Sequence, residues 1–239
     1  MTSVSIVIPM HNEAGNVSLL VAGIATACQG LDRFEIIVVD DGSTDETAAR
    51  VTGLMAEHPQ LRLVQHPQSG GQSAAVHSGV LAAKSPIICT LDGDGQNPPA
   101  ELPKLFTPLL ADPALGLVAG QRVNRQDTLS KRLASRAANA LRGWLLNDGT
   151  RDTGCGLKGF RREGFLRLPY FDHMHRYLPA LFKRDGWPIL LVDVDHAARH
   201  AGDSKYNNLQ RALVGIYDLI GVAWLIRRRK KASPVTFDE

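Results

Sequence analysis

Cysteine is scarce in this chain, and that scarcity excludes two kinds of structure. The 239 residues hold three cysteines, at positions 28, 89 and 155, with no CxxC or Cys/His spacing. So sparse and odd-numbered a set argues against a disulfide framework and against a zinc site. The first residues also lack a cationic stretch followed by a long apolar run, so no signal peptide is expected. These features predict a reduced, cytoplasmic protein.

Two nucleotide-binding fingerprints are missing as well. A Rossmann dehydrogenase shows G-x-G-x-x-G after its first strand, whereas here the apolar run 4–8 continues into Pro-Met-His-Asn-Glu. The P-loop pattern G-x-x-x-x-G-K-[ST] is absent too. The sequence therefore argues against an NAD-dependent dehydrogenase and against a P-loop NTPase.

Neither sign of charge dominates, since the formal net charge is +3. Hydrophobic residues make up 44% of the chain and charged residues 21%, which favours a packed core over disorder. Basic residues crowd into 122–142 and 227–231, so anionic partners are expected for the later part of the chain. No stacking aromatic residues accompany these cations, and a nucleic-acid partner is not expected.

Apolar strands and amphipathic helices alternate along the first half. We expect a parallel sheet covered by helices on both faces, because its strands read as continuous apolar runs. Strands are predicted at 4–8 (ended by Pro9), 35–39, 61–65, 86–91, 116–120 and 189–194. Helices are predicted at 16–28, from a Ser43 or Thr44 cap to Met55, and at 74–83, 102–110, 129–146 and 209–226.

Carboxylates follow the fourth predicted strand in the run Asp92-Gly-Asp94-Gly-Gln96. Two carboxylates at i and i+2, with glycines that let the backbone fold tightly, can face one hard cation such as Mg²⁺ or Mn²⁺. Such an ion would neutralise a diphosphate leaving group. Taken alone, an Asp-Gly-Asp run is more often an ordinary turn.

Polar clusters also close the first two strands, at residues 8–13 and 38–45. In parallel sheets ligands bind beyond the carboxyl ends of the strands, so these clusters and the Asp92 run should meet on one edge. Acidic groups there can accept hydrogen bonds from a ribose or a base. Ser43 and Thr44 could equally be helix caps.

In order and spacing these motifs resemble those of family-2 glycosyltransferases of the GT-A fold. Within that family they are similar to dolichyl- or polyprenyl-phosphate sugar transferases of the dolichyl-phosphate mannosyltransferase type. The motifs are Pro9-x-x-Asn12-Glu13, Val39-Asp-Asp-Gly-Ser-Thr-Asp45 and Asp92-x-Asp94-x-Gln96-x-Pro98-Pro99. The resemblance implies a Rossmann-like, mostly parallel α/β sheet with helices on both faces, plus a C-terminal amphipathic helix.

The resemblance also implies a donor side and a metal. The residues it assigns to the nucleotide-sugar donor are Pro9, Glu13, Asp40, Asp41 and Asp92. Those it assigns to Mg²⁺ or Mn²⁺ are Asp92, Asp94 and Gln96.

An acceptor side is implied by later motifs. Acceptor phosphate would be bound by Arg122, Lys131, Arg132 and Ser135. A late loop carrying Arg199 and Lys205 would close over the donor phosphates, and the catalytic set would be Asp94, Arg122, Arg199 and Lys205. The stretch 153–158 (Thr-Gly-Cys-Gly-Leu-Lys) resembles a bacterial subgroup rather than the eukaryotic mannose synthases.

The segment 212–226 is the most apolar of the chain. At about 1.5 Å per residue it reaches about 22 Å, short of the roughly 30 Å hydrocarbon core of a bilayer. We expect it to lie in the membrane interface, with Trp224 near the headgroups and 227–231 on anionic lipid; the alternative is a core helix with a solvated basic end. The expected organisation is a catalytic domain over 1–206 (halves 1–120 and 121–206) and a membrane-associating tail over 207–239.

The expected function is inverting transfer of a sugar from a nucleotide donor to a polyprenyl phosphate at the cytoplasmic face of the membrane, alone or with a separate membrane partner or a second copy. A phosphate acceptor needs no strong general base, since its second ionisation lies near pH 6. One alternative is transfer to a saccharide hydroxyl, for which Asp148 and Asp152 are candidate bases. Another is a non-catalytic nucleotide-binding relative.

Overall fold

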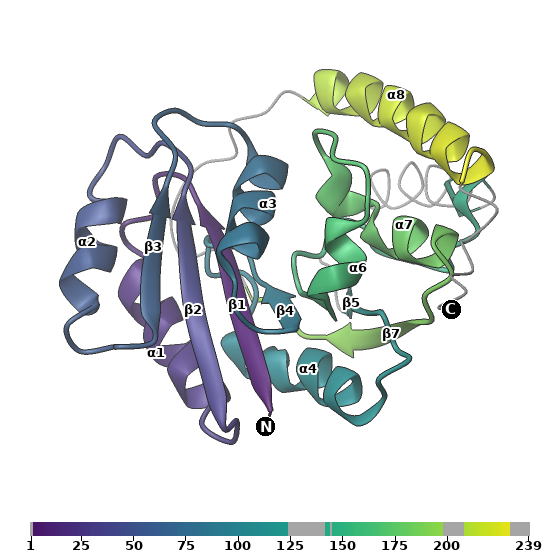
Figure 1. The fold of residues 1–239 in the computed structure, drawn as a ribbon. Coiled ribbons are helices and arrows are strands. Elements are labelled where there is room, and N and C mark those ends of the chain that lie inside the picture. The colour runs from purple at the N-terminus through teal and green to yellow at the C-terminus, as the bar shows by residue number, and fades with distance from the viewer. Residues whose placement is uncertain (1, 124–141, 144, 198–207, 230–239) are drawn as a thin grey trace, which may run out of the picture.

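A seven-stranded sheet forms the centre of the molecule, with the strand order β3-β2-β1-β4-β6-β5-β7. The computed structural model describes residues 2–123, 142–143, 145–197 and 208–229. The strands are β1 (Ser3–Met10), β2 (Arg33–Asp40), β3 (Leu61–Gln65), β4 (Ile87–Thr90), β5 (Leu117–Arg122), β6 (Lys158–Arg161) and β7 (Ile189–Val194). Figure 1 shows β1, β2 and β3 side by side at one end of the sheet.

Most neighbouring strands are parallel, as the continuous apolar runs predicted. The exception is β6, which lies antiparallel between β4 and β5. Its register pairs Lys158 with Thr90 of β4 and with Ala119 of β5. Because β6 runs in reverse, its first residue lies at the edge where β4 and β5 end. A residue of the later chain is thereby brought to the carboxyl edge of the sheet.

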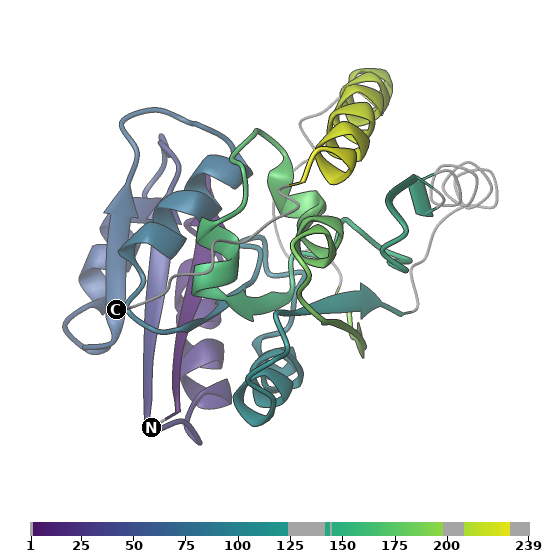
Figure 2. The same ribbon diagram turned by 45° about the vertical axis from the view of Figure 1, so that its right-hand side comes forward.

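Helices cover both faces of the sheet, as expected. One face is packed by α1 (Val17–Ala27), α2 (Thr47–Leu54) and α4 (Leu102–Ala111), and the other by α3 (Gln72–Ala82), α6 (Arg162–Leu166), α7 (Leu178–Arg184) and α8 (Asn208–Arg227). Short 3₁₀ turns at Pro99–Glu101 and Met174–Arg176 precede α4 and α7. Figure 2 shows α8 beside α7.

Two details of the sequence-based prediction were wrong. Strand β1 does not end at Pro9 but continues through it to Met10. Proline is tolerated there because β4 pairs with β1 only as far as Val7, so no strand needs the missing N–H. Ser43 and Thr44 do not cap α2, which begins at Thr47; both bond to Asn12 instead.

The predicted basic helix over 129–146 falls almost entirely outside the described residues. So do Lys131, Arg132, Ser135, Arg199 and Lys205. Strand β6 and helices α6 and α7 had no counterpart among the predicted elements. In the part of the chain that is described, no helix is long and apolar enough to cross a membrane.

Candidate active site

Polar and small residues line the carboxyl edge of the sheet on the face covered by α3 and α7. Side chains alternate between faces along a strand, so each of these residues lies two positions beyond a buried apolar one. The pairs are Val7 with Pro9, Val39 with Asp41, Ile88 with Thr90, Ala119 with Gln121, and Phe160 with Lys158. Strand geometry thus gathers chemistry-bearing residues from distant parts of the sequence at one edge.

The ends of β1 and β2 are tied together, as the motif positions predicted. The amide of Asn12, whose φ is 58°, donates to Oγ of Ser43 at 2.9 Å, and its side-chain oxygen accepts from the amide of Thr44 at 2.8 Å. The amide of Glu13 donates to Oγ1 of Thr47 at 2.9 Å. The two motifs assigned to the donor nucleoside therefore form one continuous surface.

Asp41 is held in a buried network. Both of its carboxylate oxygens accept hydrogen bonds, from the ring of His66 at 2.7 Å, Oγ of Ser69 at 2.8 Å and the amides of Gly70 and Gly71 at 2.8 and 2.9 Å. Burial raises its pKa, but these hydrogen bonds outweigh burial and the net pKa is lowered. Asp41 therefore organises the turn that leads into α3.

Replacing Asp41 with asparagine is expected to destabilise the protein by about 1–3 kcal/mol at pH 7, because one of the two accepting oxygens becomes an NH2 group that cannot accept from the donors facing it. The lowered pKa means that the carboxylate stabilises the fold above its unfolded pKa of about 3.9 and loses that effect as the pH falls through the folded value. The difference from wild type should therefore shrink below about pH 4. Urea unfolding at several pH values measures this, with exposed Asp112→Asn as the matched control. Equal stability of Asp41→Asn and wild type at pH 7 would contradict the structural role.

Asp40 is also buried, at 3% exposure, on the other side of β2. One of its oxygens accepts from the amide of Ser43 at 3.1 Å and the other from the side chain of Gln65 at 3.3 Å. These contacts orient the carboxylate beside the residue 43–47 turn. Its contact with a donor nucleoside stays a prediction.

Asp92 and Asp94 lie in the loop that leaves β4, close to the end of β1. Asp92 accepts from the side-chain amides of Gln72 at 2.7 Å and Asn97 at 2.9 Å. Burial and then the neighbouring Asp94 raise the pKa of Asp92, opposed by Lys158. A partly buried carboxylate beside a second carboxylate is stabilised by a cation, so the pair fits a metal.

The backbone around this loop is packed too tightly for side chains. A Cβ built on Gly93 would lie 2.9 Å from the carbonyl oxygen of Pro9, and one on Gly156 would lie 2.2 Å from a carboxylate oxygen of Asp92. Gly95 adopts a φ of 74°. The glycines of the motif and of the 153–158 stretch are therefore required to bring β1, β4 and β6 together.

The donor set here suits a hard cation that keeps open positions. The described residues contain no cluster of three or more His, Cys, Asp or Glu side chains able to hold a metal. Two carboxylates and an amide oxygen would leave the remaining positions of Mg²⁺ or Mn²⁺ to substrate phosphates and water. Gln96 belongs to the same loop. Its backbone carbonyl accepts a hydrogen bond from the backbone amide of Ala197 at 2.9 Å, so the segment after β7 lies against this loop.

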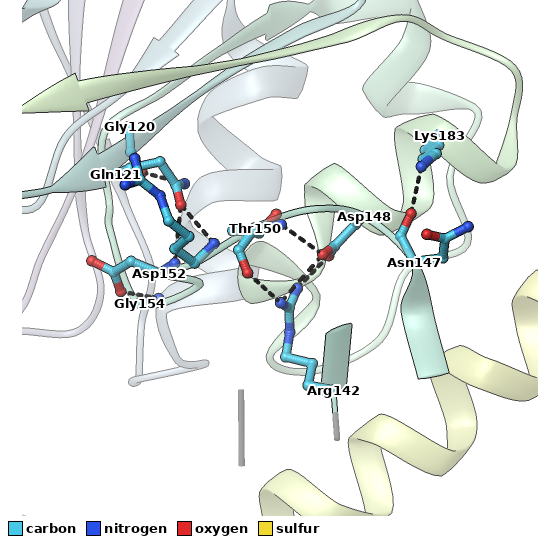
Figure 3. A network of polar contacts seen from close by, with 10 residues as sticks. Gly120, Gln121, Arg142, Asn147, Asp148, Thr150, Asp152, Gly154 and Lys183 are labelled. Carbon is cyan, nitrogen blue, oxygen red and sulfur yellow. Dashed lines mark hydrogen bonds and ion pairs between the residues drawn. The ribbon is translucent and has the colours of Figure 1, made fainter. Parts of the chain in front are cut away.

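A second polar network begins with the last two residues of β5 and holds the loop 147–154 (Figure 3). The guanidinium of Arg122 forms a bidentate ion pair with Asp152, at 2.5 and 2.9 Å. The side-chain oxygen of Gln121 accepts from the amides of Arg151 and Asp152, at 2.8 and 3.0 Å. Arg122, one of the residues predicted to bind acceptor phosphate, is therefore paired in the structure with a carboxylate thirty residues later in the sequence.

Asp148 lies deeper in the same network. Its buried carboxylate forms an ion pair with Arg142 and accepts from the amide of Thr150 at 3.0 Å. Both carboxylates considered as bases for a hydroxyl acceptor, Asp148 and Asp152, are therefore engaged with arginines.

Three residues near Asp92 were missed at the sequence level: Gln72, Lys158 and His175. Together with Pro9, Val76, Thr90, Asp92, Gly156 and Leu178 they line a pocket beneath α3 and α7. Lys158 belongs to the 153–158 stretch singled out for its subgroup character, which was a usable signal. Gln72 and His175 have no local signal, because only the packing of α3 and α7 on the sheet brings them there.

The fold and this edge define an α/β protein built to hold a ligand at the carboxyl ends of its strands. The chain belongs to glycosyl transferase family 2, whose family model matches residues 5–168. This result confirms the family that the motifs indicated.

Similar proteins of known sequence and structure agree with this assignment. An undecaprenyl-phosphate 4-deoxy-4-formamido-L-arabinose transferase of Photorhabdus laumondii is 33% identical over 91% of this chain and 66% of its own length. A dodecaprenyl-phosphate galacturonate synthase of Rhizobium johnstonii is 35% identical over 98% and 69%. Glucosyl-3-phosphoglycerate synthase of Mycobacterium tuberculosis, solved with Mn²⁺ and UDP, has a TM-score of 0.69 and 22% identity over 95% and 80%. That likeness shows the GT-A fold.

Proposed function

We propose that this chain is an inverting glycosyltransferase that moves a sugar from a nucleotide-sugar donor to a polyprenyl phosphate. The observation that carries the proposal is the Asp92–Asp94 pair at the edge where the β1 and β2 motifs meet. The names of the two sequence relatives above contain a polyprenyl phosphate, which supports the acceptor class. The chain spans about two thirds of the length of those relatives.

The state of the carboxylates near the acceptor side supports a phosphate over a hydroxyl. A sugar hydroxyl must lose its proton to a base during attack, whereas a phosphate is already ionised near neutral pH. Asp148 and Asp152 are paired with Arg142 and Arg122, so neither is poised as that base. Transfer to an anionic acceptor requires positioning and charge neutralisation, which this edge can supply.

Asp92, Asp94 and Gln96 are the residues that would hold Mg²⁺ or Mn²⁺. When bound, such an ion supplies positive charge against the diphosphate of the donor. Within the chain, Gln72 and Asn97 fix the orientation of the Asp92 carboxylate. Asp41 accepts from the amides of Gly70 and Gly71 and so fixes the turn just before Gln72, the first residue of α3. In this proposal Pro9, Glu13 and Asp40 contact the nucleoside, and Arg199 and Lys205 neutralise the leaving diphosphate.

Helix α8 supports a position at a membrane surface. One side of it packs on the core through Leu219, Val222, Ala223 and Ile226. The other side exposes four large apolar residues, Ile216, Tyr217, Ile220 and Trp224, which are 56–79% exposed. The sequence analysis left two alternatives for this helix, a membrane-interface helix and a core helix. In the structure one face of α8 packs on the core and the other is apolar and exposed.

The charges around α8 agree with this orientation. Asp218 faces the protein and pairs with His173 at 3.2 Å, so it stays out of the outer face. Arg227, Arg228 and Arg229 are exposed at the end of the helix. We propose that this surface, defined here as the α8 outer face (Ile216, Tyr217, Ile220 and Trp224), lies on the cytoplasmic leaflet, with the arginines on anionic lipid.

A donor and acceptor panel tests the proposed function. Purified protein with Mn²⁺ is offered GDP-mannose, UDP-glucose, UDP-N-acetyl sugars and UDP-uronates, each with undecaprenyl phosphate or with an oligosaccharide. Mass spectrometry is expected to find a glycosyl phospholipid and no elongated glycan. Elongation of the oligosaccharide with no lipid product would establish the hydroxyl acceptor instead. Binding of nucleotide sugar without any turnover would indicate a non-catalytic relative.

A further inference from the structure

The carboxylate of Asp92 is oriented by two amides that come from different parts of the fold. The side chain of Asn97, in the same loop, donates to one oxygen at 2.9 Å, and the side chain of Gln72, the first residue of α3, donates to the other at 2.7 Å. Each carboxylate oxygen has two lone pairs, so one lone pair on each oxygen stays available for a cation. Partners of this kind orient a metal ligand, and their loss typically lowers metal affinity about ten- to a hundredfold.

The contact from Gln72 depends on where α3 begins. Asn97 belongs to the loop of Asp92 itself, whereas Gln72 reaches that loop from another element. The N-cap residue of α3 is Gly71, which has no side chain that could fix the start of the helix. Asp41 holds the turn before it through the amides of residues 70 and 71. A second support comes from the turn before α7.

This second support is a pair of contacts between Ser73 and His175. Oγ of Ser73 accepts from the backbone amide of His175 at 3.3 Å and lies 2.7 Å from Nδ1 of its ring. Ser73 is fully buried, so its hydroxyl hydrogen needs an acceptor, and Nδ1 is within reach. Nδ1 therefore accepts, as a neutral ring allows, and burial lowers the pKa of His175 well below its usual value. The two hydrogen bonds clamp the second residue of α3.

The turn that carries His175 is itself anchored. Its neighbours Met174 and Tyr177 are buried in the core on this face of the sheet. The carboxylate of Asp172 lies against the start of α3, because a Cβ built on Gly71 would be 3.6 Å from one of its oxygens. His175 therefore connects a packed turn to the first turn of α3.

We propose that His175 is a positioning residue for the metal site. Through Ser73 it fixes the start of α3, and this start aims the amide of Gln72 at Asp92. Without the clamp the first turn of α3 can shift, and Asp92 then loses one of the two donors that orient it. The inference rests on the proposed function, because Asp92 is one of the residues proposed to hold the divalent cation.

Two replacements of His175 separate the clamp from the space that the ring fills. Asparagine and leucine have similar sizes, but only asparagine offers an acceptor close to the position of Nδ1. Mn²⁺ is titrated into the full chain, with and without UDP, and free Mn²⁺ is measured by electron paramagnetic resonance. Mn²⁺ affinity should fall about tenfold in His175→Leu and much less in His175→Asn. His58→Leu, just before β3 at the opposite edge of the sheet, is the matched control and should bind like the wild type.

A double variant tests whether His175 acts through Gln72. Gln72→Leu alone should lower Mn²⁺ affinity at least as much as His175→Leu, because it removes the donor itself. Adding His175→Leu to Gln72→Leu should then change the affinity little further, since the donor that His175 positions is already gone. In sugar transfer, the Mn²⁺ concentration for half-maximal rate should rise in His175→Leu while kcat at saturating Mn²⁺ stays near that of the wild type.

Wild-type Mn²⁺ affinity in folded His175→Leu would overturn the inference and leave the proposed function standing. Additive losses in the double variant, or equal losses in His175→Leu and His175→Asn, would indicate a general packing effect and overturn it as well. Absence of Mn²⁺ binding by the wild type, beyond that of UDP itself, would overturn both the metal assignment and this inference. Thermal unfolding checks that each variant is folded, and Ser73→Ala, which removes the same clamp, takes the place of His175→Leu if that variant is unfolded.

Discussion

Replacing Asp94 with asparagine is expected to lower the rate of sugar transfer about a hundred- to a thousandfold, the usual effect of removing one preorganised charge-stabilising group from an active site. Asp94 follows the partly buried Asp92 by two residues, and its position is fixed by a hydrogen bond from the amide of Gln96 to its carboxylate at 3.1 Å. Asparagine can still accept that bond, so the loop should keep its shape. What the variant loses is the negative charge that a divalent cation requires.

The measurement is kcat at saturating donor and acceptor over a range of Mn²⁺ and Mg²⁺ concentrations. The variant should require more metal and stay slow at saturation, because donor charge is then poorly neutralised. Asp112→Asn, an exposed position after α4, controls for loss of a carboxylate as such. Full activity of Asp94→Asn in the presence of EDTA would refute the metal assignment. Thermal unfolding separates a catalytic loss from misfolding.

Much of the first half could be predicted from the sequence because local and global preferences agree there. Strands β1 and β2 are apolar runs rich in Val and Ile, and their ends carry the polar motifs. Parallel pairing then forces those ends to one edge. The convergence of Asn12, Ser43 and Asp92 needed no knowledge of distant contacts.

The second half could not be predicted in the same way, because its elements depend on tertiary partners. Strand β6, Lys-Gly-Phe-Arg, has no strand period and only four residues. It is a strand because β4 and β5 bond to it on both sides. The positions of single side chains could not be predicted either. No pattern near Arg122 in the sequence indicates its pairing with Asp152. His175 lines the pocket only because α7 and the turn before it pack on the sheet. Pro9 shows the opposite situation. Proline usually ends a strand, but β1 continues through Pro9 because β4 pairs with β1 only as far as Val7.

Substituting Ile216, Ile220 and Trp224 together with serine is expected to weaken binding to anionic liposomes about a hundredfold or more. Each large apolar side chain contributes about 1.5–3 kcal/mol when fully removed from water, and shallow insertion realises part of that. A loss of about 3 kcal/mol of binding free energy over the three residues corresponds to about a hundredfold weaker binding. The fold should survive, because the core contacts of α8 are made by Leu219, Val222, Ala223 and Ile226 on its other side.

Flotation with vesicles of phosphatidylcholine and phosphatidylglycerol measures the change, at low and high salt. The matched control replaces three apolar residues exposed elsewhere, Leu19, Met55 and Leu81, with serine. Only the α8 variant should lose binding, and the remaining affinity should fall with salt because exposed arginines at the helix end attract anionic lipid at about 1 kcal/mol each. If both triple variants float like the wild type, the α8 outer face does not contact lipid. A change of oligomeric state in the α8 variant alone, with flotation intact, would assign that face to a second copy of the chain.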